Sequence, residues 1–79
     1  MATNISPSVP NVRIARRNWR ILAEEFPTAG IKPYPVGEAE HRRNWQKFHQ
    51  ASPGTPIDPN PQTVSEMKRN WQIVYEDLH

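Results

Sequence analysis

Three tryptophans at one fixed spacing constrain this chain more than any other feature of its sequence. Trp19, Trp45 and Trp71 are 26 residues apart in a chain of 79 residues. A fixed period of this kind is the signature of tandem structural units. Four more positions are identical at the same period and a fifth is always basic: Ile5, Ile31 and Ile57; Pro7, Pro33 and Pro59; Arg17, Arg43 and Arg69; Asn18, Asn44 and Asn70; and Arg16, Arg42 and Lys68. The sequence therefore predicts three units, residues 2–27, 28–53 and 54–79.

Each unit carries the signals of one helix. Residues of N-cap type recur 26 apart, at Asn11, Gly37 and Thr63. Thr63 is followed three residues later by Glu66, which is the pattern of a capping box. Pro27 and Pro53 end the first two helices, because a residue that precedes proline is disfavoured in the helical region. The predicted helices are 12–26, 38–51 and 64–78.

Apolar residues give each predicted helix one narrow seam. Their 3,4,3,4 spacing runs through Val12, Ala15, Trp19, Leu22 and Phe26, and again through Val64, Met67, Trp71, Val74 and Leu78. The middle helix keeps little beyond Trp45 and Phe48. A helix of about 15 residues is marginal alone in water, so something must cover these seams.

Three architectures could cover them. Helical solenoids use helix pairs over about 33 residues or more and need polar end units, so a solenoid is disfavoured. A compact bundle would join its helices through linkers of about eleven residues, longer than the usual 2–8. We therefore expect an all-α chain of three short helices, each preceded by an extended Ile-x-Pro lead. The chain would lie extended along a partner, with little independent core.

The repeated residues are the candidate contact set. On a helical wheel, Arg17 lies about 160° from Trp19, so identical residues occur on opposite faces of one helix. Trp and Arg often dominate interfaces, and Asn can bond backbone groups on a neighbour. The predicted partner-binding residues are Ile5, Arg16, Arg17, Asn18, Trp19, Ile31, Arg42, Arg43, Asn44, Trp45, Ile57, Lys68, Arg69, Asn70 and Trp71. The alternative is that these identities are remnants of duplication, with Trp in a core and Arg solvated.

Other classes of protein have little support in the sequence. The chain has no cysteine, and its three histidines show no metal-ligand spacing, so we expect no metal and no cofactor. No nucleophile-base set or Gly-rich phosphate loop is present, so we expect neither catalysis nor a small-molecule substrate. No apolar run approaches the roughly 20 residues that cross a bilayer, and the helix seams are narrow and the leads proline-rich, so we expect no membrane partner. A small chain without cysteine fits the cytoplasm, which is the location we expect.

The leading functional hypothesis is a non-catalytic adaptor. Its three equivalent Arg-Asn-Trp helices would bind repeated sites on a protein oligomer with symmetric subunits, as a staple, decoration or linker. Asn18-Trp19-Arg20-x-x-Ala23 resembles the Trp-basic helical motif of algal Rubisco linker proteins over six residues, although Gln46 and Gln72 replace the arginine in the other units. The alternatives are a self-folding three-helix domain and a nucleic-acid-binding protein that uses its basic and aromatic residues.

Overall fold

The computed structural model describes residues 4–78, which form three helices and no strand. Helix α1 spans Val12–Glu25, α2 spans Gly37–Ala51 and α3 spans Val64–Leu78. The predicted all-α class and its three helices are confirmed, and every helix end lies within one residue of the prediction. The outer limits of the predicted units, at residues 2 and 79, lie outside the described residues.

The helix starts follow from their capping residues. The Asn11 side chain accepts a hydrogen bond of 3.1 Å from the backbone N–H three residues later, and Thr63 does the same at 3.1 Å. These bonds satisfy amide groups that have no partner inside the helix. The middle helix differs from the prediction, because Gly37 is its first residue and Val36 before it has no side-chain cap.

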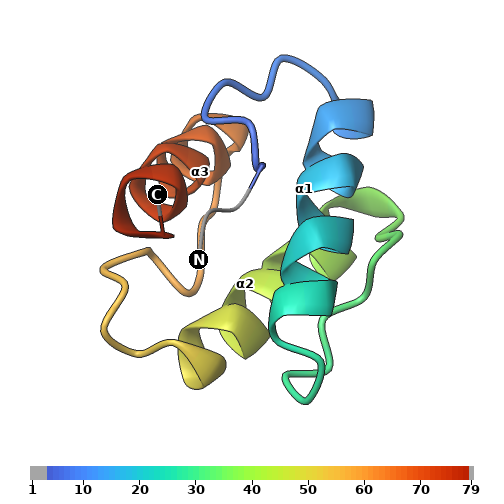
Figure 1. The fold of residues 1–79 in the computed structure, drawn as a ribbon. Coiled ribbons are helices and arrows are strands. Elements are labelled where there is room, and N and C mark those ends of the chain that lie inside the picture. The colour runs from blue at the N-terminus through green and yellow to red at the C-terminus, as the bar shows by residue number, and fades with distance from the viewer. Residues whose placement is uncertain (1–3, 79) are drawn as a thin grey trace.

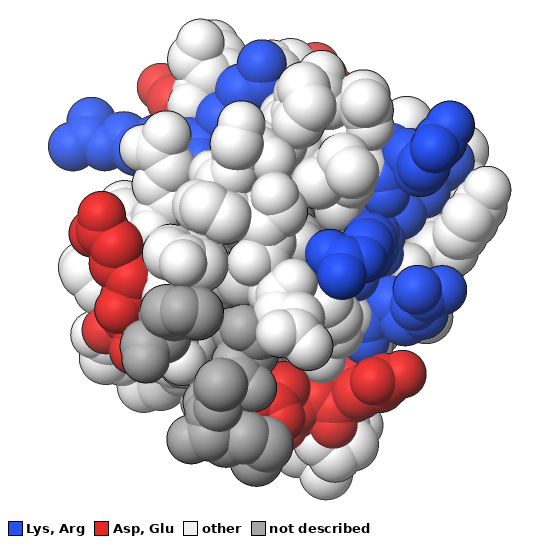
Figure 2. Space-filling view, turned by 45° about the horizontal axis from the view of Figure 1, so that its top comes forward, with Lys and Arg blue, Asp and Glu red and all other residues white. Residues whose placement is uncertain are grey.

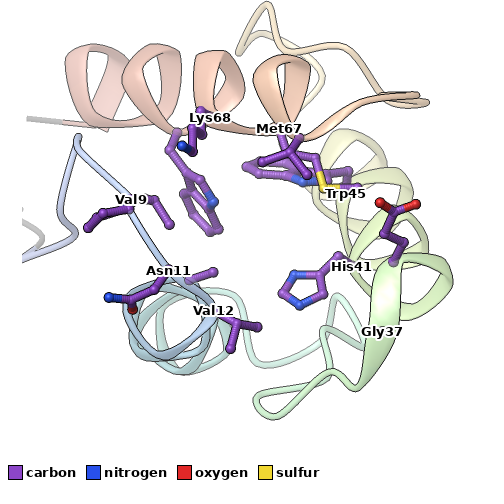
Figure 3. Close-up of a pocket in the computed structure, with 13 residues that line it drawn as sticks. Val9, Asn11, Val12, Gly37, His41, Trp45, Met67 and Lys68 are labelled. Carbon is purple, nitrogen blue, oxygen red and sulfur yellow. The ribbon is translucent and has the colours of Figure 1, made fainter.

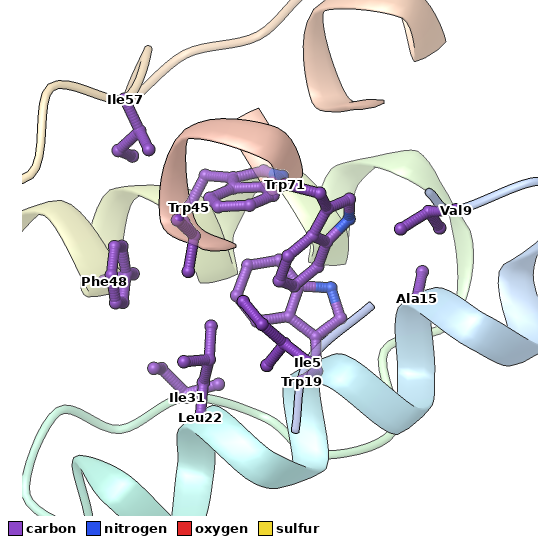
Figure 4. Packing of buried hydrophobic residues seen from close by; sticks show 11 residues of the cluster. Ile5, Val9, Ala15, Trp19, Leu22, Ile31, Trp45, Phe48, Ile57 and Trp71 are labelled. Atoms are coloured by element: carbon purple, nitrogen blue, oxygen red, sulfur yellow. The ribbon is translucent and has the colours of Figure 1, made fainter. Parts of the chain in front are cut away.

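The three helices pack around a common centre (Figure 1), and the three tryptophans cluster in the buried core (Figure 4). Trp19, Trp45 and Trp71 are 0%, 0% and 2% exposed. Their ring centroids lie 4.5 Å, 4.6 Å and 4.5 Å apart, with interplanar angles of 59–64°. Tilted and edge-on contacts of this kind place the positive edge of one ring against the negative face of the next. Each tryptophan thus packs against both of the others.

The Ile-x-Pro leads form the second layer of this core. Ile5, Ile31 and Ile57 are 3%, 7% and 5% exposed and belong to the same buried cluster as the tryptophans. A lead of the first unit also contributes Val9. The leads therefore cover the apolar helix seams, for which the sequence alone indicated no covering segment within the chain.

An asparagine holds each lead to its own helix. Asn44 accepts a hydrogen bond from the Lys32 backbone N–H and donates one to the Lys32 carbonyl, both at 2.9 Å. The same pair of bonds links Asn18 to Ser6 and Asn70 to Asp58. The side-chain amide matches the donor and acceptor of an extended backbone residue, as a neighbouring strand would. These three asparagines are at most 1% exposed.

The expectation of an extended chain with little independent core is not met in this structure. The radius of gyration is 10.9 Å, close to the roughly 12 Å typical of a folded domain of this size. The physical reason is that the linkers supply core residues and backbone partners, so they are not spacers. No helix within residues 4–78 is long and apolar enough to cross a membrane.

Candidate functional site

The fold divides the predicted contact residues into an inner and an outer group. The inner group is every predicted Ile, Asn and Trp: Ile5, Asn18, Trp19, Ile31, Asn44, Trp45, Ile57, Asn70 and Trp71. These side chains contact one another or their own leads, so a partner could reach them only if the fold opened. That the residues of the inner group contact a partner remains a prediction, and it applies only to an opened form of the chain.

Two of the basic residues join one unit to the next. Arg16 Nε donates to the Pro35 carbonyl at 3.1 Å, and Arg42 Nε donates to the Pro61 carbonyl at 2.9 Å. Both arginines therefore fix the lead that follows their helix. Lys68, the third residue of this set, is exposed on α3.

The outer group is the predicted basic residues, and on α1 these share one face with two further arginines. Arg13, Arg16, Arg17 and Arg20 follow i, i+3, i+4, i+7 spacing, which places them along one side of a helix. They border one shallow depression together with Tyr34 and two apolar residues. Figure 2 shows Lys and Arg side chains gathered on the side of the molecule where α1 lies. This set of four arginines is called the α1 arginine face below.

The α1 arginine face is not neutralised by carboxylates. Within residues 4–78, none of its guanidinium groups forms an ion pair, although Arg17 Nη1 donates to the Asn4 carbonyl at 3.3 Å. On α2 the situation is different, because Arg42 lies 3.5 Å from Glu38. Among the described residues, helix α1 therefore carries four basic residues without an ion pair on one face, whereas α2 and α3 carry two each: Arg43 and Lys47, and Lys68 and Arg69.

In the middle unit, the Glu40 carboxylate stabilises the start of α2. The Glu40 carboxylate accepts a hydrogen bond of 2.6 Å from the Val36 backbone N–H and lies 3.0 Å from Lys32 Nζ. The backbone hydrogen bond, followed by that from Lys32, lowers the pKa of Glu40 below its usual 4.5. Glu40 therefore remains charged at neutral pH and fixes the start of α2.

An exposed aromatic ring extends the α1 arginine face. Tyr34 is 63% exposed, and the Arg16 guanidinium carbon lies 4.3 Å from the centre of its ring. Arg16 Nη1 also donates to the Tyr34 hydroxyl at 3.3 Å. Arg13, Arg20 and Tyr34 were not among the predicted contact residues, because they do not repeat between the units. Their signal was present in the helical spacing of the arginines in the first unit.

No metal site is formed by the side chains of residues 4–78, since these contain no cluster of three histidine, cysteine, aspartate or glutamate residues. A comparison of the chain with protein-family models, with curated proteins and with solved structures finds no match. The site must therefore be interpreted from its own geometry.

Proposed function

We propose that this chain is a non-catalytic adaptor that binds acidic surfaces of a protein oligomer, with the α1 arginine face as its main contact. The observation that carries this proposal is the row of four guanidinium groups with no carboxylate partner. Arginine presents a planar fork that binds carboxylates through two parallel hydrogen bonds. A helix or edge that carries carboxylates at matching spacing would complement this row.

In this proposal each of the three 26-residue units provides one contact, and the contacts differ in strength. Arg43 and Arg69 occupy the position of Arg17 on α2 and α3, and all three side chains are exposed. They would serve as weaker copies of the α1 site, which alone carries Arg13 and Arg20 in addition.

Binding in an extended form is the variant of this proposal that the core disfavours. Opening the chain would expose the three tryptophans and the leads to water. Removing one buried Trp side chain typically costs about 3–5 kcal/mol, so exposing three would consume most of the stability of a small domain. We therefore propose that the compact form is the one that binds.

Nucleic acid is the second candidate partner, favoured by the exposed Tyr34 beside Arg16. An aromatic ring and guanidinium groups together can stack on bases and neutralise phosphates. The overall charge of only +2 disfavours it, because nucleic-acid binding depends on phosphate neutralisation.

The experiment is a fluorescence-anisotropy titration of the full chain with two defined probes. One probe is a helical peptide with glutamates at i, i+3, i+4 and i+7, and the other is a short DNA duplex. The α1 variant carries Arg13→Gln, Arg17→Gln and Arg20→Gln. Its matched control loses the same charge elsewhere, through Arg43→Gln, Lys47→Gln and Arg69→Gln.

The proposal expects the peptide to bind the natural chain and the α1 variant to lose roughly tenfold in affinity, as three exposed ion pairs would give. The control should keep the tightest site and bind fewer peptides at saturation. Circular dichroism should show unchanged helicity in both variants. Equal losses in the two variants would show that only net charge matters. Preferential binding of DNA, with a steep loss in salt, would replace the proposal with the nucleic-acid function.

A further inference from the structure

A second site lies away from the α1 arginine face, between the first turns of the three helices. A pocket of about 260 Å³ opens there (Figure 3). Its apolar wall consists of Val9, Ala15, Trp45, Met67 and Trp71. Its volume exceeds the roughly 150 Å³ of an apolar cavity that binds benzene, so it has room for a single-ring molecule.

The pocket exists because one position of the repeat differs in size between units. His41 lies beside Trp19 and accepts a hydrogen bond from its indole N–H at 3.1 Å. Met67 and Ala15 occupy the same position of the third and first units. All three residues line the pocket, and alanine is the smallest of them. The space therefore opens where the short Ala15 side chain leaves the wall incomplete.

A second difference between the units, at the position of Arg16, Arg42 and Lys68, also contributes to the pocket. Arg16 and Arg42 each bond the lead of the following unit, whereas Lys68 lies at the pocket together with Val9 of the first lead. Within residues 4–78 the Lys68 ammonium has no carboxylate partner. A positive charge thus stands at the rim of an apolar pocket.

The buried wall also contains an unused hydrogen-bond donor. Trp45 is fully buried, and its indole N–H has no hydrogen-bond partner. Figure 3 shows Trp45 beside Met67 at the wall of the pocket. Met67 is an unbranched, flexible side chain that can move to admit a ligand atom. An unpaired buried N–H is costly, so an acceptor brought by a ligand would gain a strong hydrogen bond.

The remaining polar groups at the pocket favour an anion. His41 Nδ1 accepts the Trp19 proton, so the neutral imidazole carries its own proton on Nε2 and is a further donor. The N-terminal turns of all three helices border the pocket, and such turns carry partial positive charge. The one acid at the rim, Glu38, lies 3.5 Å from Arg42 and is partly neutralised by it.

We propose that this pocket binds a small aromatic carboxylate, with the ring in the apolar space beside Ala15 and Met67 and the carboxylate toward Lys68. The sequence alone predicted no small-molecule substrate, and the site proposed here is for binding and not for catalysis. It is independent of the α1 arginine face.

The test follows the three indole N–H signals of the full ¹⁵N-labelled chain by NMR. The probes are phenylacetate and benzyl alcohol, which share a ring and differ in charge. We expect phenylacetate to shift the Trp45 and Trp71 signals saturably and to bind more tightly than benzyl alcohol. Lys68→Gln, an exposed substitution, should weaken phenylacetate about two- to fivefold and leave benzyl alcohol unchanged.

A second variant fills the space. Ala15→Leu adds a side chain inside the pocket and should abolish the shifts by both probes. If this variant does not fold, Lys68→Gln still tests the proposal, because it should weaken the binding of phenylacetate and not that of benzyl alcohol. Absence of saturable indole shifts at millimolar phenylacetate, shifts confined to surface residues, or equal affinity for both probes would overturn the proposal.

Discussion

The asparagine that holds each lead offers the sharpest test of how this fold is stabilised. Asn44 is 1% exposed and makes two hydrogen bonds of 2.9 Å to the backbone of Lys32. Each bond contributes a net of about 0.5–1.5 kcal/mol, so Asn44→Ala should lower the free energy of unfolding by about 1–3 kcal/mol. A domain of this length has about 4–12 kcal/mol in total, so this loss is large.

The assay is urea unfolding followed by the fluorescence of the buried tryptophans. With a slope of about 1 kcal/mol per molar urea, the midpoint should fall by roughly 1–3 M. Alanine favours the helix more than asparagine does, by up to about 0.7 kcal/mol, and this gain offsets part of the loss. The measured loss is therefore a lower bound on the contribution of the two hydrogen bonds. Gln46→Ala on the exposed side of the same helix is the control, and it should change the stability by about 0.5 kcal/mol at most.

Asn44→Asp separates the two hydrogen bonds. An ionised aspartate accepts from the Lys32 N–H but has no proton to donate to the Lys32 carbonyl. A protonated aspartate has one, so the folded state binds the proton more tightly than the unfolded chain. The stability of this variant relative to the natural chain should therefore recover as the pH falls toward about 4. A loss in Asn44→Ala no larger than in Gln46→Ala, or no recovery in Asn44→Asp, would refute the proposed role of the asparagine.

Two further predictions concern the position that His41 and Met67 share. Burial, followed by the nearby charge of Arg16, lowers the pKa of His41 below its usual 6.5, while Glu40 and Glu38 raise it. The unfolded chain then takes up the proton first, so the free energy of unfolding should be highest above about pH 6.5 and fall as the pH drops below it. Thermal melts across this range check the effect, and His41→Met should flatten the pH dependence in this window. Met67→His should raise the urea midpoint by an amount equivalent to about 1 kcal/mol, because imidazole would supply the acceptor that the buried indole N–H next to it lacks; an unchanged midpoint would count against this explanation.

Helix positions were predictable because they depend on local chemistry. Asn11 and Thr63 cap helices in the structure as their residue types and positions indicate, and Pro27 follows the end of α1 closely. The all-α class follows from the same signals. These features need no knowledge of what lies across the core, so one sequence is enough to find them.

The compact arrangement was harder to predict because it depends on contacts between segments that are distant in the chain. Linkers of about eleven residues rich in proline are typical of spacers. Here they contribute Ile5, Ile31 and Ile57 to the core, and each presents the N–H and the carbonyl of one backbone residue to an asparagine. These residues are recognisable from their identity between units, but the contacts that they make within the chain were predicted to be contacts with an external partner.

The candidate site was predictable only in part, because its residues differ between the units. A search for identical residues finds what the units share, and here the shared Ile, Asn and Trp build the fold. The features that distinguish the units carry the two proposed sites: Arg13 and Arg20 on α1, and Ala15 in the pocket.

Arg17, Arg43 and Arg69 are shared by the three units but do not build the fold. They are identical in all three units, yet they are exposed and contribute no buried packing. The hydrogen bond from Arg17 to the Asn4 carbonyl is itself at the surface, where such a bond adds little to stability. The demands of the core explain why the tryptophans and asparagines are identical, but they do not explain the arginines, which are either remnants of duplication or contact residues. The proposed recognition of an acidic partner would keep them, because a guanidinium that must meet a carboxylate cannot be replaced by a neutral side chain without losing that contact.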